Sequence, residues 1–187
     1  MLHFVLETTL RSHPGKFNYA SSGVGSASHL GLEMLKLYAK VDMVNVSYKG
    51  SAPSITALLS GEVQMALLGP LSVKPLITAG KVRPLAVTTP KRSTAFPSLP
   101  TLSESGVPKY DMTGWYGILA PRGTPSHAVE RLNTSIAAAQ TNKALSNALS
   151  PEGAELVAMT PQQFDAHIKI QITQFSELLR KLNLRAK

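Results

Sequence analysis

The chain has 187 residues, 43% of them hydrophobic and 16% charged, which is typical of a compact body with a core and argues against disorder. It contains no cysteine, so disulfides, thiolate metal sites and cysteine nucleophiles are excluded. The formal net charge of +8 favours anionic partners, but the basic residues are scattered and not interleaved with aromatic ones, so we expect no nucleic-acid binding.

The start of the chain predicts a short leader helix over residues 2–10, ended by the turn His13-Pro14-Gly15. Glu7 interrupts its apolar residues, and neither a basic start nor a small-residue cleavage site is present, so we do not expect it to act as an export signal. No apolar run approaches the roughly 20 residues that span a bilayer.

A unit of strand, Gly- and Ser-rich turn and amphipathic helix then recurs. We expect strands over residues 17–20, 43–48 and 63–68, each followed by a helix, at 28–40, 52–59 and 71–79, and a fourth strand over residues 82–88. This alternation predicts an α/β fold in which helices flank a parallel or mixed sheet.

The second half follows a Pro- and Ser-rich loop at residues 89–108. It predicts a strand over residues 112–120, a helix capped by Thr124 that runs to about residue 141, and a shorter helix over residues 143–150. A last strand is expected over residues 155–159. Thr160-Pro161 then opens a final helix whose apolar residues keep helical spacing: Phe164, Ile168, Ile172, Phe175 and Leu179.

Three turns at the carboxyl ends of the first three strands are the candidate ligand site. Each leads into a helix N-terminus, where backbone N–H groups and the helix dipole favour anions, and ligands of open α/β sheets bind at this edge. The turn Ser21-Ser22-Gly23-Val24-Gly25-Ser26 adds hydroxyl donors and glycines that let a ligand approach. The same residues would also serve a purely structural turn, and the sequence leaves both interpretations open.

The sequence gives less support to dinucleotide binding, metal binding or catalysis. Gly23-x-Gly25-x-x-Ser28 lacks the third glycine of a dinucleotide site, and Asp42 precedes its strand instead of following it. His29 and Lys49 could face an anion, or could be ordinary surface groups. Without a His pair, a placed pair of acids or a Gly-x-Ser-x-Gly elbow, we expect no metal, no cofactor and no catalytic residues.

Ordered motifs over most of the chain resemble one receptor family. They are residues 14–30 (Pro-Gly-Lys-Phe-Asn-Tyr-Ala-Ser-Ser-Gly-Val-Gly-Ser-Ala-Ser-His-Leu), 46–53, 79–88, 97–101 and 114–121, with Gly123-Thr124-Pro125 and Thr160-Pro161 after them. These segments resemble the substrate-binding proteins of tripartite tricarboxylate transporters, also called Bordetella-uptake-gene or Bug receptors.

The resemblance implies a periplasmic-binding-protein-like fold of two lobes, a periplasmic location, a small carboxylate or related organic acid as ligand, and membrane components of a transporter as partners. It implies a non-catalytic protein whose ligand is held by turns. Carried onto this sequence, the ligand-binding residues are Ser21, Ser22, Gly23, Gly25, Ser26, His29, Lys49, Gly50, Ser51, Gly69 and Pro70.

The chain departs from the family pattern at its start, where the export signal, first strand and glycine-rich loop of the first lobe are not found. We therefore expect a linker-helix remnant at residues 1–15, a nearly complete second lobe at 16–111, and at 112–187 a crossover strand and helices of an incomplete first lobe. We further expect exposed apolar surface that favours a homodimer or domain swap, and weakened carboxylate binding. The alternatives are a truncated pseudo-receptor or interaction module and, from another class, a small α/β enzyme acting on an anionic substrate.

Overall fold

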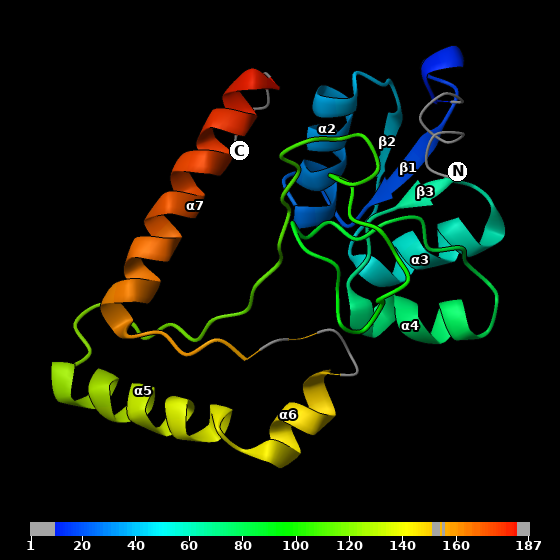
Figure 1. Ribbon diagram of the computed structural model, residues 1–187. Coiled ribbons are helices and arrows are strands. Elements are labelled where there is room, and N and C mark those ends of the chain that lie inside the picture. Colours follow the sequence, from blue (N-terminus) through cyan, green and yellow to red (C-terminus); the bar gives the residue numbers. More distant parts are fainter. Residues whose placement is uncertain (1–9, 151–153, 155, 183–187) are drawn as a thin grey trace. The chain divides into compact units, whose positions relative to one another are not determined.

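The computed structural model describes residues 10–150, 154 and 156–182 of the chain. The chain divides into two compact units, Met1–Gly114 and Trp115–Lys187, which are described separately below (Figure 1). The leader helix predicted over residues 2–10 lies outside the described residues except for its last residue, the buried Leu10. The turn predicted at residues 13–15 is present.

The first unit is built on a three-stranded parallel sheet. Its strands are β1 (Asn18–Ser21), β2 (Val44–Ser47) and β3 (Met65–Ala66), in the order β2-β1-β3. Ala20 of β1 lies opposite Val46 on one side and Ala66 on the other. The α/β class with a parallel sheet and helices, predicted from the sequence, is therefore confirmed.

Each strand is followed by a helix, as the recurring pattern predicts. The helices are α2 (Ala27–Ala39), α3 (Ser51–Ser60) and α4 (Pro70–Thr78), and each of their bounds differs from the predicted one by one residue. α3 ends at Gly61, whose φ of 79° lies in the left-handed region that glycine adopts without strain.

The core of the first unit forms around the central strand. Ala20, Ala57 and Val63 are buried together, and Tyr19 beside them is fully buried. The Tyr19 hydroxyl donates a hydrogen bond of 2.6 Å to Glu33 Oε1 of α2. Burial, and then this carboxylate, raise the pKa of Tyr19, so the hydroxyl stays protonated and ties the strand to the helix.

The fourth strand, predicted over residues 82–88, does not form. Only Val87 makes a bridge, to Thr101, and residues 82–86 lie outside any strand. Pro84 gives a physical reason, because it has no N–H with which to continue a ladder. The loop after it is held by Glu104, which bonds to Arg92 at 3.0 Å and accepts from the Thr101 N–H at 2.8 Å.

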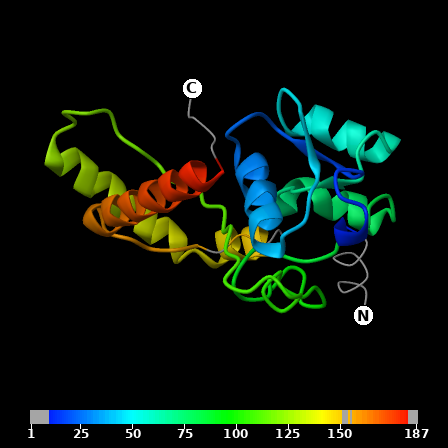
Figure 2. The same ribbon diagram turned by 90° about the horizontal axis from the view of Figure 1, so that it is seen from above.

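The second unit consists of three helices and extended segments. Its helices are α5 (Ser126–Gln140), α6 (Lys143–Leu149) and α7 (Pro161–Lys181), and α5 contacts both of the others (Figure 2). Thr160 caps α7 in a reciprocal pair with Gln163, as expected of a Thr-Pro helix start. The predicted cap of α5 was wrong by one residue: Pro125 is the N-cap, and Thr124 instead donates to the Pro121 carbonyl at 2.8 Å.

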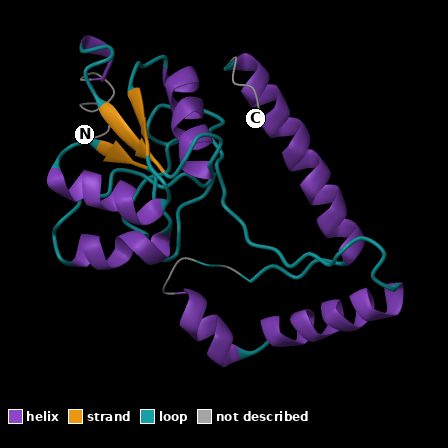
Figure 3. Cartoon of the chain, turned by 180° about the vertical axis from the view of Figure 1, so that it is seen from behind, coloured by secondary structure: helices purple, strands orange, loops and turns teal. Residues whose placement is uncertain are grey.

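The strands predicted over residues 112–120 and 155–159 are not formed. Figure 3 shows strands only in the first unit, and residues 112–120 and 156–159 are loops, while Glu155 lies outside the described residues. These segments have the composition of strands, but a strand exists only when a neighbour pairs with its backbone. Among the described residues only Met112 finds such a partner, since its N–H donates to the Thr88 carbonyl at 2.9 Å.

None of the described helices combines the length and the apolar character required to cross a bilayer.

Gly31 of α2 lies where the helix meets the end of the first unit. The Tyr110 hydroxyl donates to the Gly31 carbonyl at 2.8 Å, and Tyr110 is 1% exposed. Burial raises the pKa of Tyr110, so this donor stays protonated. This hydrogen bond joins residues 79 positions apart in the sequence and so holds Tyr110, near the end of the first unit, against α2.

We predict that Gly31→Ala lowers the free energy of unfolding of the first unit by about 1–3 kcal/mol, the usual effect of overfilling a packed site. The added methyl would lie 2.7 Å from Leu67 Cδ1 and 3.1 Å from Met112 Cγ. Urea unfolding followed by circular dichroism measures the effect. Gly114→Ala is the matched control, since a methyl there meets nothing within 4 Å. Equal stabilities of the two variants would contradict the prediction.

Candidate functional site

The candidate site is the edge of the sheet at which the three parallel strands end. The first two turns meet there: the Tyr48 N–H donates to the Ser21 carbonyl at 2.9 Å, and the Gly50 N–H donates to the Ser22 carbonyl at 3.1 Å. The third turn, Gly69-Pro70, follows the neighbouring strand β3. Among the described residues it makes no hydrogen bond to the other two turns.

Ser28, in the first turn of α2, organises the Ser21–Ser26 turn. Its buried hydroxyl accepts from the Ser22 N–H at 2.9 Å and lies 3.0 Å from the hydroxyls of Ser22 and Ser26. Ser54 does the same for the second turn, where its hydroxyl lies 3.1 Å from the Ser21 carbonyl and 2.9 Å from the Gly50 carbonyl. Ser28 and Ser54 were not among the predicted site residues, although each is a serine in the first turn of a helix behind such a turn.

His29 lies beside the same turn, and its ring supports the backbone. The Gly25 N–H donates to His29 Nδ1 at 3.1 Å, and the residue is 4% exposed. Burial lowers the pKa of His29; the charge of Glu33 opposes this shift and that of Lys36 adds to it. The neutral ring is the form that can accept from Gly25, so His29 positions the turn.

The backbone geometry of the turn requires glycine at two of the predicted positions. Gly23 has φ 138° and Gly25 has φ 81°, values that residues with a side chain rarely adopt. Between them Val24 is 73% exposed at the surface of the turn. The N–H groups of Ser22, Gly25 and Ser26 are bonded within the turn or to α2, so the two glycines set the course of the backbone at this edge.

The electrostatics of this edge favour an anion. α3 and α4 begin at Gly50 and Gly69 with no side-chain cap, and none of the three helices has an acidic residue in its first turn. The Ser21 hydroxyl is buried and has no hydrogen-bond partner among the described residues. Lys49, Ser51 and Pro70 are exposed at the same edge. Helix starts without acidic residues suit a ligand that brings negatively charged oxygen atoms.

A metal would need a different set of side chains. Within the described part of the chain, no group of three or more His, Asp or Glu residues lies close enough to hold a metal ion.

A parallel sheet with helix N-termini gathered at one edge is the arrangement found in periplasmic binding proteins, and solved structures of this class share the fold of the chain. The chain belongs to the tripartite tricarboxylate transporter receptor family, whose family model matches residues 4–184.

Individual relatives agree with this assignment. The protein BugT of Bordetella pertussis is 32% identical over 177 residues, which are 95% of this chain and 54% of BugT. The structure of R. palustris Rpa4515 with adipate matches with a TM-score of 0.88 and 37% identity, over 94% of this chain and 58% of that one. MatC from Rhodopseudomonas palustris with bound malate matches with a TM-score of 0.78 and 26% identity, over 93% and 60% of the two chains.

The chain spans about half the length of BugT and of the UPF0065 protein from Pseudomonas sp. strain P51. The family and the fold are therefore those of the receptors, while the matched region is only part of a receptor.

We predict that the first unit loses stability as the pH falls below about 6.5, the ordinary pKa of histidine. A base whose pKa is lowered by folding binds more protons in the unfolded chain, so the free energy of unfolding falls as the pH drops through the window below 6.5. Protonation would also remove the acceptor for the Gly25 N–H. Urea unfolding at a series of pH values from 8 to 5 measures this loss.

His29→Gln should flatten this pH dependence. The matched control is His127→Gln, which removes an exposed imidazole from α5 and should behave like the parent chain. A His29→Gln variant with the parent's full pH dependence would show that His29 is not the group responsible.

Proposed function

We propose that the chain is a solute-binding receptor for small carboxylates and that the sheet edge of the first unit is its binding surface. The observation that carries the proposal is the gathering of three helix starts, none with an acidic residue in its first turn, at one edge of the sheet. The same edge ends in Ser21, whose buried hydroxyl has no hydrogen-bond partner among the described residues. Such a surface offers hydrogen-bond donors without a fixed counter-charge.

A carboxylate fits this surface chemically. Its two oxygens accept several N–H and O–H bonds at once, and bonds to an ionised acceptor are shorter and stronger than neutral ones. Adipate and malate, the ligands named for two of the solved relatives, are both dicarboxylates. Dicarboxylates are accordingly the first ligands to test.

The ligand-binding residues that we propose are the turn residues predicted from the sequence together with Ser28. A cluster of three hydrogen-bonded hydroxyls lies beside the start of α2, from Ser22, Ser26 and Ser28. Gly50, with Ser51 next to it, begins α3, and Gly69, with Pro70 next to it, begins α4. We assign His29 a supporting role, because its Nδ1 is already bonded to Gly25.

Capture without catalysis is the activity that this surface supports. Proton transfer would require a titratable group directed at the ligand. His29 is buried and already bonded to the turn, and Lys49 is an exposed turn residue. We therefore propose a non-enzymatic role.

The remaining parts of the proposal follow the family. Residues 16–111 would be the second lobe of the receptor, and residues 112–187 the part of the chain that returns to the first lobe. The receptor would act in the periplasm and pass its solute to membrane components of a tripartite transporter. The matched region supplies the contacts of one lobe, so we expect weaker binding than a receptor with both lobes would show.

We predict that adipate or malate raises the melting temperature of the purified chain, but only at millimolar concentration. A ligand at one hundred times its dissociation constant adds about 2.7 kcal/mol, which corresponds to several degrees. Adipamide, a neutral diamide of the same length, should give no shift. A flat response to a panel of di- and tricarboxylates, with a cooperative melting transition, would contradict the proposal.

Ser22→Ala tests the site directly. It should weaken carboxylate binding about tenfold or more, because it removes a hydrogen bond to a charged group. Ser60→Ala is the matched control, since this serine lies at the end of α3 and bonds only to the Ala57 carbonyl. Equal losses in the two variants would place the ligand elsewhere.

A further inference from the structure

An imidazole is bonded to the turn at the sheet edge of the first unit. His29 of α2 is 4% exposed, and its Nδ1 accepts from the Gly25 N–H at 3.1 Å. A ring nitrogen that accepts a hydrogen bond carries no proton, so the neutral ring has its proton on Nε2. The bond to Gly25 therefore exists only while His29 is neutral, and the charge of the ring is linked to the position of the turn.

Gly25 lies next to the cluster of three hydroxyls that we propose to hold the ligand. The hydroxyl of Ser26, its neighbour in the chain, lies 3.0 Å from that of Ser28, which in turn lies 3.0 Å from the Ser22 hydroxyl. The Ser26 hydroxyl also accepts from the His29 N–H at 3.3 Å and so caps α2. His29 is thus joined to this turn twice, through its ring at Gly25 and through its backbone at Ser26.

The turn is free to change its course when the bond from Gly25 to His29 is lost. Gly23 and Gly25 have φ values of 138° and 81°, and a Cβ built at Gly25 would meet nothing within 4 Å. Glycine moves between backbone conformations at little steric cost. A second proton on the ring of His29 places an N–H group opposite the Gly25 N–H, and two donors do not bond to each other. Protonation of His29 therefore drives the backbone at Gly25 away from the ring.

Two charged side chains of the same helix act on the ring of His29. Burial lowers the pKa of His29, the charge of Glu33 opposes this shift, and the charge of Lys36 adds to it. On the side of the sheet, Glu33 accepts from the neutral Tyr19 hydroxyl of β1 at 2.6 Å. Lys36 lies 3.0 Å from Glu33 and 3.9 Å from Asp42. Removal of either charge on α2 therefore shifts the pH at which His29 is protonated.

We propose that His29 is a positioning residue through which pH controls carboxylate binding at the sheet edge. Its neutral ring holds Gly25 and the hydroxyl cluster in the arrangement that binds; its charged ring releases Gly25, and the affinity falls. The inference rests on the proposed function of this edge and adds the regulation of that function. A charged ring that acted only by attraction would have the opposite effect, because it would strengthen the binding of an anion as the pH falls. The sign of the pH dependence therefore separates positioning from attraction.

The test is a pH series from 8 to 5, in which NMR follows the Gly25 amide of the ligand-free chain and titrations with adipate measure the affinity. We expect the Gly25 amide to titrate together with the His29 ring. The dissociation constant of adipate should rise about tenfold for each pH unit below the pKa of that ring, because only the neutral fraction binds. Adipate itself gains protons at the acid end of the range. Each value is therefore divided by that of His29→Gln, whose amide oxygen accepts from Gly25 without titrating.

The ligand-free measurement and the titrations separate this inference from the proposed function. A Gly25 amide that does not follow the protonation of His29 would overturn the inference. So would an adipate affinity that is present at pH 8 and then stays level, or rises, as the ring becomes charged. Absence of adipate binding already at pH 8 would refute the proposed function, and the control of affinity with it. Circular dichroism at each pH confirms that the chain is folded.

Two charge variants of α2 move the midpoint of the pH profile in opposite directions. Glu33→Gln removes the charge that favours the protonated ring and should lower the midpoint, while its amide oxygen still accepts from Tyr19. Lys36→Gln removes the opposing charge and should raise the midpoint. His29→Leu has no acceptor for Gly25 and should bind adipate weakly at every pH. Midpoints that both variants leave in place would overturn the proposal.

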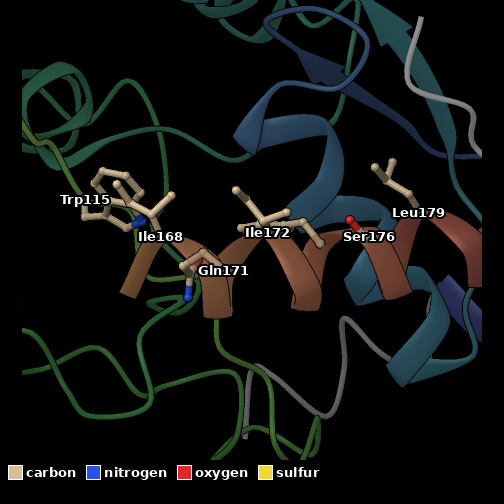
Figure 4. A pocket seen from close by; sticks show the side chains of 7 residues that line it. Trp115, Ile168, Gln171, Ile172, Ser176 and Leu179 are labelled. Atoms are coloured by element: carbon tan, nitrogen blue, oxygen red, sulfur yellow. The ribbon is translucent and has the colours of Figure 1, made fainter. Parts of the chain in front are cut away.

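His167 of α7 is the matched control imidazole. It is partly buried in the second unit, and its ring packs edge-on against Trp115 with 5.5 Å between the centroids. Trp115 is 42% exposed and lines a shallow groove along α7 with Ile168 and Ile172 (Figure 4). His167→Gln should keep the pH profile of the parent chain. A profile flattened as much as that of His29→Gln would show that the effect does not come from the bond to Gly25, and would overturn the proposal.

Discussion

The parallel pairing of β1 with strands on both of its sides is the constraint on which the first unit depends. A strand of four residues has few hydrogen bonds of its own, and its stability comes from its neighbours and from buried side chains such as Tyr19. Because both partners run parallel to it, all three strands end at one edge. The turns and helix starts that could hold a ligand therefore gather at that edge.

The sequence was sufficient to predict the three strand–turn–helix repeats of this unit, because their signals are local. Apolar strands, glycines such as Gly61 and helix caps such as Ser26 specify each element within a few residues. The strands expected near Trp115 and Val157 were wrong for the opposite reason: composition indicates that a segment can pair, but only a neighbour makes it a strand. Within the site, Ser28 was missed because its role depends on the hydroxyls that the folded turn brings around it.

The two units differ in how completely their polar backbone is satisfied. In the first unit, side chains such as Ser54 donate hydrogen bonds to carbonyl groups of the turns. In the second, α6 and α7 have side-chain caps, yet residues 115–120 have no backbone hydrogen bond among the described residues and carry exposed apolar side chains. The second unit therefore has well-formed helices, and few tertiary contacts join them among the described residues.

Trp115 determines the tryptophan fluorescence of the chain. It is the only tryptophan in the chain, so the whole indole emission comes from the second unit. The ring is half-exposed and stands edge-on to His167, so the wavelength of its emission should shift when water is displaced from it. The molecule thus carries a built-in fluorophore that reports on the surroundings of Trp115 in the second unit.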